Sequence, residues 1–169
     1  TINTILKETY GYEQFRNLEI YDDLSKGKEK LCISQGQLIE NVILEAEKAW
    51  KSETQVDNIL LTAPTGSGKS LLFQLPAIYL GKEYNLLTIV VSPLKALIVD
   101  QVESLQELGY ARVAYASSDL SPEQKMEVYR QVREGEIDLF YLSPELLLSY
   151  DIKHFVGERR IGLVVVDEA

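Results

Sequence analysis

The chain has 169 residues, of which 46% are hydrophobic and 25% charged, and its formal net charge is −9 at pH 7. The length suits a globular domain with a real core. The acidic balance excludes a general nucleic-acid coat, which needs clustered Lys and Arg, but leaves a local nucleic-acid groove open. The single cysteine, Cys32, and the single histidine, His154, exclude an internal disulfide framework and a Cys/His zinc site.

Neither single residue is expected to carry chemistry. Cys32 is predicted to be a small buried or half-buried residue, and His154 to be a surface residue and not a catalyst. No apolar run approaches the roughly 18–20 residues that span a bilayer, and no N-terminal segment resembles a signal peptide. We therefore expect a cytoplasmic protein without membrane contact.

The first 57 residues are polar and favour helix, and we treat 1–57 as an N-terminal segment. The apolar spacing predicts one helix over Gln37–Lys51. Before it, residues 17–36 are charged and show no sustained period, which is typical of an irregular inserted segment. A partner-binding insertion and a disordered loop are both open, so a protein partner through 17–36 is one expectation.

From Asn58 onward, short continuous apolar runs alternate with amphipathic stretches. Continuous runs are typical of strands buried on both faces, and alternating strands and helices predict right-handed parallel crossovers. We expect an α/β fold over 58–169: a doubly wound, mainly parallel sheet of about five strands with flanking helices. The predicted strands are Ile59–Thr62, Leu86–Val91, Arg112–Tyr115, Ile137–Leu142 and Leu163–Val166. The predicted helices are Lys69–Tyr79, Leu94–Leu108, Pro122–Arg133 and a short one from Pro144.

Local signals fix some helix ends. Ser121 precedes Pro122 and is the expected N-cap of the third of these helices. Gly109 and Gly135 follow the second and third helices, where a glycine commonly ends a helix.

The stretch APTGSGKS resembles a phosphate-binding loop, with Ala63 where the strict pattern has glycine. Glycines let successive backbone N–H groups face one anion, and the following helix adds the positive end of its dipole. Lys69 would reach the β- and γ-phosphates, and the Ser70 hydroxyl would ligate Mg²⁺. The candidate phosphate-binding residues are Thr65, Gly66, Ser67, Gly68, Lys69 and Ser70.

The run LVVVDE is typical of a buried strand that ends in two carboxylates. Asp167 would hold Mg²⁺ together with Ser70, and Glu168 would orient the attacking water. A pure nucleotide binder does not need the glutamate, whereas hydrolysis does. We therefore favour an NTPase, with Lys69, Asp167 and Glu168 as catalytic residues, over a nucleotide-dependent scaffold.

Several segments together resemble the first RecA-like motor domain of RecQ-like superfamily 2 DNA helicases. They are TAPTGSGKSLLFQLPAIYL, VVSPLKALIVDQVESL, ASSDLSPEQKMEVYRQVREGEIDLFYLSPELLLS and LVVVDEA, in the family's order. The resemblance implies ATP and Mg²⁺ as cofactors and 3′-to-5′ unwinding of single-stranded or partly duplex DNA. It also implies that the chain is an N-terminal fragment with an incomplete motor domain, inactive without the second lobe.

Upstream, YGYEQFR resembles the start of the family's adenine-binding motif. The resemblance implies that Tyr12 and Arg16 sandwich the adenine and that Gln37 reads its edge, which would favour ATP. The family pattern continues almost at once into Gly-Gln, whereas Gly36-Gln37 follows here after about twenty residues. Either an insertion splits the motif, or Gln37 is not its glutamine.

The turns that follow three predicted strands would face DNA phosphates in such a helicase, and would position a strand without reading its sequence. Ordinary helix capping explains the same residues and is compatible with DNA contact. The candidate DNA-binding residues are Ser92, Pro93, Leu94, Lys95, Ser117, Ser118, Ser143, Pro144 and Glu145.

Two alternatives stay open. A DEAD-box-like RNA helicase would usually show PTREL and TPGR-like turns, where this chain has SPLKAL and SPEL. A non-catalytic P-loop interaction module would use the fold to dock a partner, and the acidic surface and the inserted segment are its motivation.

Overall fold

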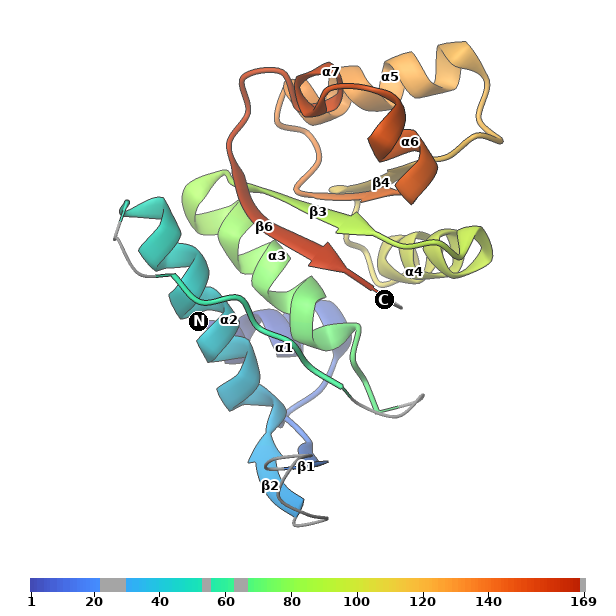
Figure 1. The fold of residues 1–169 in the computed structure, drawn as a ribbon. Helices are drawn as coiled ribbons and strands as arrows, with labels where there is room; N and C mark the ends of the chain where they lie inside the picture. Colours follow the sequence, from blue (N-terminus) through green and yellow to red (C-terminus); the bar gives the residue numbers. More distant parts are fainter. Residues whose placement is uncertain (22–29, 53–55, 63–66, 168–169) are drawn as a thin grey trace. The chain divides into compact units, whose positions relative to one another are not determined.

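The computed structural model describes residues 1–21, 30–52, 56–62 and 67–167 (Figure 1). The chain forms two compact units, residues 1–76 and 77–169, and the division falls within helix α3, Leu71–Tyr84. The domain boundary expected at residue 57 stays a prediction. The other elements of the first unit are α1 (Ile2–Tyr10), β1 (Asn17–Tyr21), β2 (Lys30–Ser34) and α2 (Gln35–Trp50).

We predicted an irregular segment over residues 17–36, but its described residues form an antiparallel strand pair. Strands β1 and β2 run in register from Asn17↔Ser34 to Tyr21↔Lys30. The prediction failed because a two-stranded ribbon has little to bury and so shows weak alternation. Cys32 is exposed for the same reason, which corrects the buried or half-buried position predicted for it.

Helix α2 confirms the predicted helix and begins with a capping box at Ser34. Its buried residues lie on one stripe, at the spacing of successive helical turns. They are Gln35, Gly36, Ile39, Ile43 and Ala46. This stripe, with Ile5, Leu6 and Leu18, contributes to the buried core of the first unit.

The strand predicted at Ile59–Thr62 does not form. These residues are irregular, and the side chains of Ile59 and Leu60 are 49% and 89% exposed. A strand needs a neighbour for its backbone N–H and C=O groups, and no described strand pairs with this run. An apolar run alone does not specify that neighbour.

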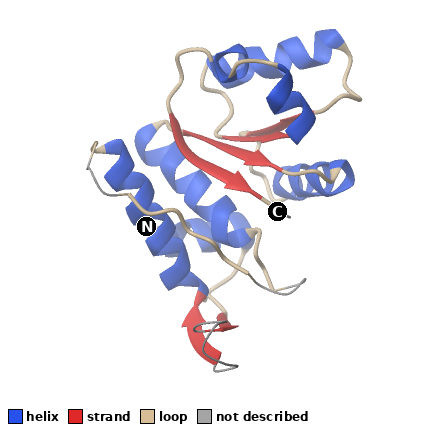
Figure 2. Ribbon diagram, in the orientation of Figure 1, coloured by secondary structure: helices blue, strands red, loops and turns tan. Residues whose placement is uncertain are grey.

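The second unit contains a parallel sheet of four strands in the order β4-β5-β3-β6. Figure 2 shows strands of this sheet in red with helices in blue beside them. Its parallel pairing and flanking helices confirm the predicted α/β class. All four strands lie where the apolar runs predicted them, within about two residues. The elements of this unit are β3 (Leu87–Val91), α4 (Lys95–Glu107), β4 (Val113–Ala116), α5 (Pro122–Arg133), β5 (Leu139–Leu142), α6 (Pro144–Ser149), α7 (Ile152–Val156) and β6 (Ile161–Val166).

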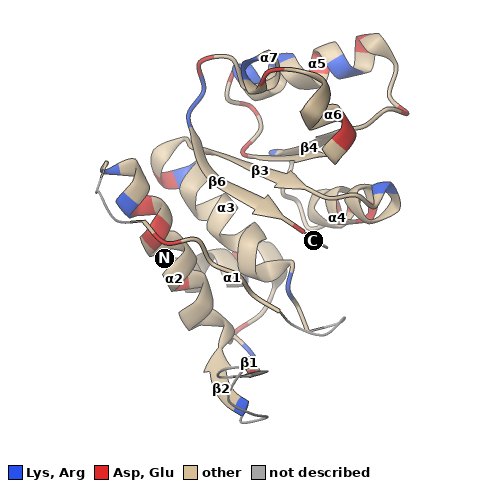
Figure 3. Cartoon of the chain, in the orientation of Figure 1, with Lys and Arg blue, Asp and Glu red and all other residues tan. Residues whose placement is uncertain are grey.

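The four strands of this sheet carry no charged residue (Figure 3). The central strands β3 and β5 are fully buried. Ile89 and Phe140 face one side, where they pack with Tyr129 of α5 and Phe155 of α7. Alternate residues face the other side, where Tyr141 contacts α4. The central strands β3 and β5 are therefore covered by helices on both faces, whereas Val164 and Val166 of β6 are exposed.

The predicted helix-end signals are confirmed. Ser121 accepts a hydrogen bond from the backbone N–H of Gln124 at 3.2 Å and completes a capping box. Gly109 and Gly135 have φ values of +87° and +81°, which glycine adopts without strain. His154 is exposed and stacks on Tyr150, in keeping with a surface residue.

A buried carboxylate joins several elements at the amino end of β5. Asp138 is fully buried and accepts hydrogen bonds from Tyr110 Oη at 3.1 Å, from Arg112 Nε at 2.6 Å and from Arg159 Nη2 at 2.9 Å. The hydrogen bond from Arg112 to Asp138 raises the pKa of the guanidinium above its usual value. Two cations therefore compensate one buried anion.

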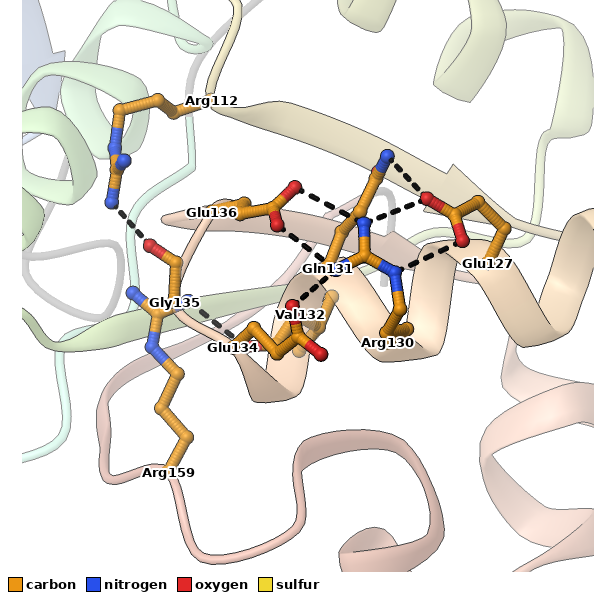
Figure 4. A network of polar contacts seen from close by, with 9 residues as sticks. All are labelled: Arg112, Glu127, Arg130, Gln131, Val132, Glu134, Gly135, Glu136 and Arg159. Atoms are coloured by element: carbon orange, nitrogen blue, oxygen red, sulfur yellow. Dashed lines mark hydrogen bonds and ion pairs between the residues drawn. The ribbon is translucent and has the colours of Figure 1, made fainter.

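The two arginines also bind backbone carbonyl groups near the end of α5 (Figure 4). Arg112 Nη2 donates to Gly135 O at 2.6 Å, and Arg159 Nη1 donates to Val132 O at 3.2 Å. A separate exposed cluster surrounds Arg130, whose guanidinium binds Glu127, Glu134 and Glu136. These hydrogen bonds, above all the one to Glu127, raise the pKa of Arg130. Exposed pairs of this kind contribute little to stability.

Helix α3 approaches Asp138 so closely that only glycine fits at position 81. A Cβ atom added to Gly81 would lie 2.4 Å from Asp138 Cγ. A glycine-to-alanine change inside a helix usually stabilises it by about 1 kcal/mol. Here Gly81→Ala is expected to destabilise the protein by about 1–3 kcal/mol, because the buried carboxylate cannot move without breaking its hydrogen bonds.

Urea unfolding measures this effect. The control is Glu83→Ala, at an exposed position of the same helix, which should change stability by no more than about 0.5 kcal/mol. A Gly81→Ala protein as stable as the parent would show that the contact with Asp138 is loose.

Candidate functional site

Tyr12 and Arg16 lie together after helix α1. The Arg16 guanidinium carbon is 6.0 Å from the centre of the Tyr12 ring, and Tyr12 stacks on Tyr10 with ring centroids 6.5 Å apart. Both residues are exposed. An aromatic ring beside a planar guanidinium offers two faces suited to a purine.

The base of the β1–β2 hairpin brings Gln35 back to Arg16. The backbone N–H of Gln35 donates to Arg16 O at 2.9 Å, and the backbone N–H of Arg16 donates to Gln35 Oε1 at 3.1 Å. Gln35 is only 2% exposed. Arg16 and Gln35 are therefore hydrogen-bonded to each other at the ends of the paired strands, although these two residues lie 19 positions apart in the sequence.

Gln37 is engaged differently. It is exposed, and its side-chain oxygen accepts a hydrogen bond from the backbone N–H of Ser34 at 3.2 Å, as part of the capping box. The structure therefore brings Gln35, and not Gln37, into hydrogen bonding with Arg16. The sequence contained a signal for Gln35, since it shares the buried stripe of α2 with Ile39 and Ile43 at four-residue spacing.

The structure describes only the second half of the phosphate loop, residues 67–70. Thr65, Gly66 and the preceding Ala63 and Pro64 lie outside the described residues. Gly68 has φ +81°, and a Cβ there would lie 2.7 Å from Gln35 Nε2. Glycine is needed at this position both for the backbone conformation and for the space beside the glutamine amide.

Lys69 and Ser70 stand at the junction between this loop and α3. The backbone N–H of Leu72 donates to Lys69 O at 3.0 Å, and that of Gln74 donates to Ser70 O at 2.9 Å, which forms the first helical turn. The Ser67 hydroxyl is buried and has no hydrogen-bond partner among the described residues. A glycine turn, a buried hydroxyl and a helix start fit a bound phosphate.

The candidate DNA-binding residues and Asp167 share one edge of the sheet in the second unit. Because the strands are parallel, the turns after β3, β4 and β5 and the residue after β6 all lie at the carboxyl edge. The backbone continues the sheet at this edge: Ser92 N donates to Leu142 O at 3.1 Å, and Asp167 N donates to Val91 O at 2.9 Å.

The hydroxyl groups at this edge face inward and not toward solvent. Ser92, Ser117 and Ser143 are 1%, 3% and 2% exposed. The Ser143 hydroxyl caps α6 by accepting from Leu146 N at 3.4 Å, as the capping alternative predicted. The three hydroxyls are therefore buried in this structure, and their contact with a nucleic acid stays a prediction.

The residues of these turns that do face solvent form a smaller set. They are Pro93, Leu94, Lys95, Ser118 and Glu145, and Pro144 is half-buried. Lys95 Nζ donates to Ser118 Oγ at 2.6 Å and to Asp119 Oδ1 at 2.9 Å, so the turns after β3 and β4 are in contact. The hydrogen bond from Lys95 lowers the pKa of Asp119.

Asp167 is half-buried, and its Oδ2 atom accepts a hydrogen bond from Gln101 Nε2 at 3.4 Å. Glu168 lies outside the described residues. Among the residues that are described, no three His, Cys, Asp or Glu side chains form a cluster able to hold a metal ion. One carboxylate is nevertheless enough for Mg²⁺ when phosphates and water supply the other ligands.

The comparison with known families decides what kind of domain this is. The family model described as "DEAD/DEAH box helicase" matches residues 44–169, most of the chain. This chain belongs to the DEAD/DEAH box helicase family. The match extends over the phosphate-loop sequence, the turns at the carboxyl edge and the Asp-Glu pair at residues 167–168.

Individual relatives of this helicase-family chain confirm the resemblance to RecQ-type proteins. ATP-dependent DNA helicase RecQ of Haemophilus influenzae is 29% identical over 169 residues, which is 100% of this chain and 22% of that protein. RecQ of Synechocystis is 32% identical over 100% of this chain and 29% of that protein. The Arabidopsis thaliana ATP-dependent DNA helicase Q-like 5 is 32% identical over 99% of this chain and 15% of that protein.

The helicase-family chain therefore spans less than a third of each of these relatives. Within the described part of the chain, every helix is too short or too polar to cross a bilayer.

Proposed function

We propose that this chain is the ATP-binding lobe of a RecQ-type DNA helicase, in which ATP hydrolysis drives the unwinding of DNA. The observation that carries the proposal is the shared carboxyl edge of the second unit. There Asp167, the candidate magnesium ligand, follows β6, and the candidate DNA-binding turns follow β3, β4 and β5. Neighbouring strands thus join the nucleotide chemistry to the nucleic-acid surface.

The first unit would hold the nucleotide. Tyr12 and Arg16 would stack on the two faces of the adenine. We assign the hydrogen bonds to the adenine edge to Gln35 in place of Gln37. The supporting contacts are the hydrogen bonds between Gln35 and Arg16 and the approach of Gln35 Nε2 to Gly68. One amide would then touch both the adenine side and the phosphate loop of the same nucleotide.

The phosphates would lie on the backbone N–H groups of residues 65–70, with the Lys69 ammonium on the β- and γ-phosphates. Ser70 and Asp167 would hold Mg²⁺, which when bound neutralises developing charge on the phosphates. Glu168 would accept a proton from the attacking water and orient it. Lys69, Asp167 and Glu168 are thus the proposed catalytic residues.

DNA would lie along the exposed part of the carboxyl edge. Lys95 and the backbone N–H groups of Leu94 and Ser118, in the turns after β3 and β4, offer contacts to phosphates, which position a strand without reading its bases. Pro93 has no backbone N–H and would contribute only to the shape of its turn. The net charge of −9 argues that DNA is held at this local surface and not over the whole protein. Polarity from 3′ to 5′ is proposed from the similarity to RecQ-type proteins.

Removal of the Lys69 ammonium tests the proposed function. In the complete protein, Lys69→Ala should lower DNA-stimulated ATP hydrolysis by about 100-fold or more, because the charge on the transferred phosphate loses its stabilisation. Lys153→Ala, at an exposed position on α7, is the control and should hydrolyse ATP like the parent. Equal rates for Lys69→Ala and the parent would contradict the proposal, and so would a parent protein without Mg²⁺-dependent ATP binding.

The assignment of Gln35 predicts a change in nucleotide preference. Gln35→Ala should weaken ATP binding by about 3- to 10-fold and leave GTP binding unchanged, because one base-specific hydrogen bond is worth about 1 kcal/mol. Gln37→Ala should lower the stability of α2 by about 1 kcal/mol through the lost cap, without a change in the ATP-to-GTP ratio. Fluorescence titration with both nucleotides measures the ratio, and the reverse pattern would assign the adenine edge to Gln37.

A further inference from the structure

A chain of three side chains in the second unit ends on Asp167. Gln101 of α4 is buried, and its Oε1 atom accepts a hydrogen bond from Tyr141 Oη at 2.9 Å. Its Nε2 atom donates to Asp167 Oδ2 at 3.4 Å. Tyr141, on β5, is 1% exposed. The three residues come from a helix, a central strand and the end of an outer strand.

We propose that Gln101 is a positioning residue for Asp167, and that Tyr141 fixes the orientation of the Gln101 amide. This inference rests on the proposed function, in which Asp167 binds Mg²⁺. The Asp167 carboxylate only accepts hydrogen bonds, so the amide must present its NH₂ group to it. The amide oxygen then faces the opposite way, where the tyrosine hydroxyl donates to it.

The amide is well suited to this task because it carries no charge. A lysine or arginine at position 101 would neutralise the carboxylate and compete with a divalent cation for it. A glutamine donates one hydrogen bond and leaves the negative charge in place. An ionised carboxylate accepts about four hydrogen bonds or ligand contacts, and the Gln101 amide uses one of them.

Burial of the two supporting residues makes the arrangement specific. In a water-excluded site a polar group must find its partner within the protein, and side chains in such networks hold one orientation. Gln101 shares the buried side of α4 with Ile98, Val102 and Leu105. Outer partners of metal ligands commonly set ligand orientation and metal affinity in this way.

The position of Gln101 on α4 adds a consequence for coupling. Lys95, at the first turn of the same helix, contacts Ser118 and belongs to the proposed DNA surface. Gln101 lies six positions after Lys95, which is about 9 Å along the helix axis. A shift of α4 upon DNA contact would therefore move the amide that holds Asp167.

The test measures metal-dependent nucleotide binding in the complete protein, without turnover. A fluorescent ATP analogue is titrated at increasing Mg²⁺ concentration, and also in EDTA, for the parent and for Gln101→Leu and Tyr141→Phe. Gln101→Leu should raise the Mg²⁺ concentration for half-maximal binding by about tenfold, and Tyr141→Phe should raise it by a smaller factor. Binding in EDTA should not change in either variant.

Gln106→Leu is the matched control, because it makes the same change at an exposed position of α4. It should leave the Mg²⁺ dependence as in the parent. If Gln101→Leu only lowers thermal stability and keeps the parental Mg²⁺ dependence, Gln101 is structural and the inference is overturned. If the parent itself binds ATP without any Mg²⁺ dependence, the proposed function fails, and this inference fails with it.

Discussion

The second unit depends on one buried carboxylate and the cations around it. Asp138 has no access to solvent, and an unpaired ionised group there would be far costlier than any single packing defect. Arg112 and Arg159 compensate it, and Gly81 leaves it room. Helix α3, the start of β4, the start of β5 and the loop before β6 are thereby joined at the amino edge of the sheet.

The two edges of this sheet have different tasks. At the amino edge, Tyr110 and Arg112 donate hydrogen bonds to the buried carboxylate of Asp138. At the carboxyl edge, the turns after the strands expose backbone and side chains, and the neutral amide of Gln101 donates a hydrogen bond to Asp167. Because the internal hydrogen bonds of the Asp138 cluster lie at the amino edge, the carboxyl edge is available for ligands. In open parallel sheets, ligands bind at the carboxyl edge. The sheet thereby provides a rigid support for both proposed contacts.

Sequence patterns predicted the parts of the molecule whose determinants are local. The runs at Leu87–Val91 and Leu139–Leu142 are apolar because both sheet faces are covered, and Ser121-Pro122 encodes its helix start directly. The hairpin and Gln35 were missed, because the pairing of Arg16 with Gln35 depends on residues that the chain brings together only after folding. The strand predicted at Ile59–Thr62 was wrong for a related reason, because an apolar run does not show which strand it would pair with. The Gln101–Asp167 contact joins residues 66 positions apart, which no local spacing predicts.

The central claim is that nucleotide chemistry and DNA contact meet at the carboxyl edge of the four-stranded sheet. The most direct measurement is a crystal structure of the complete protein with a non-hydrolysable ATP analogue, Mg²⁺ and a single-stranded oligonucleotide. The account predicts Asp167 in the metal's coordination sphere, directly or through a water, with DNA phosphates against the turns that follow β3 and β4. DNA bound at the amino edge near Asp138, or a metal ion remote from Asp167, would contradict it.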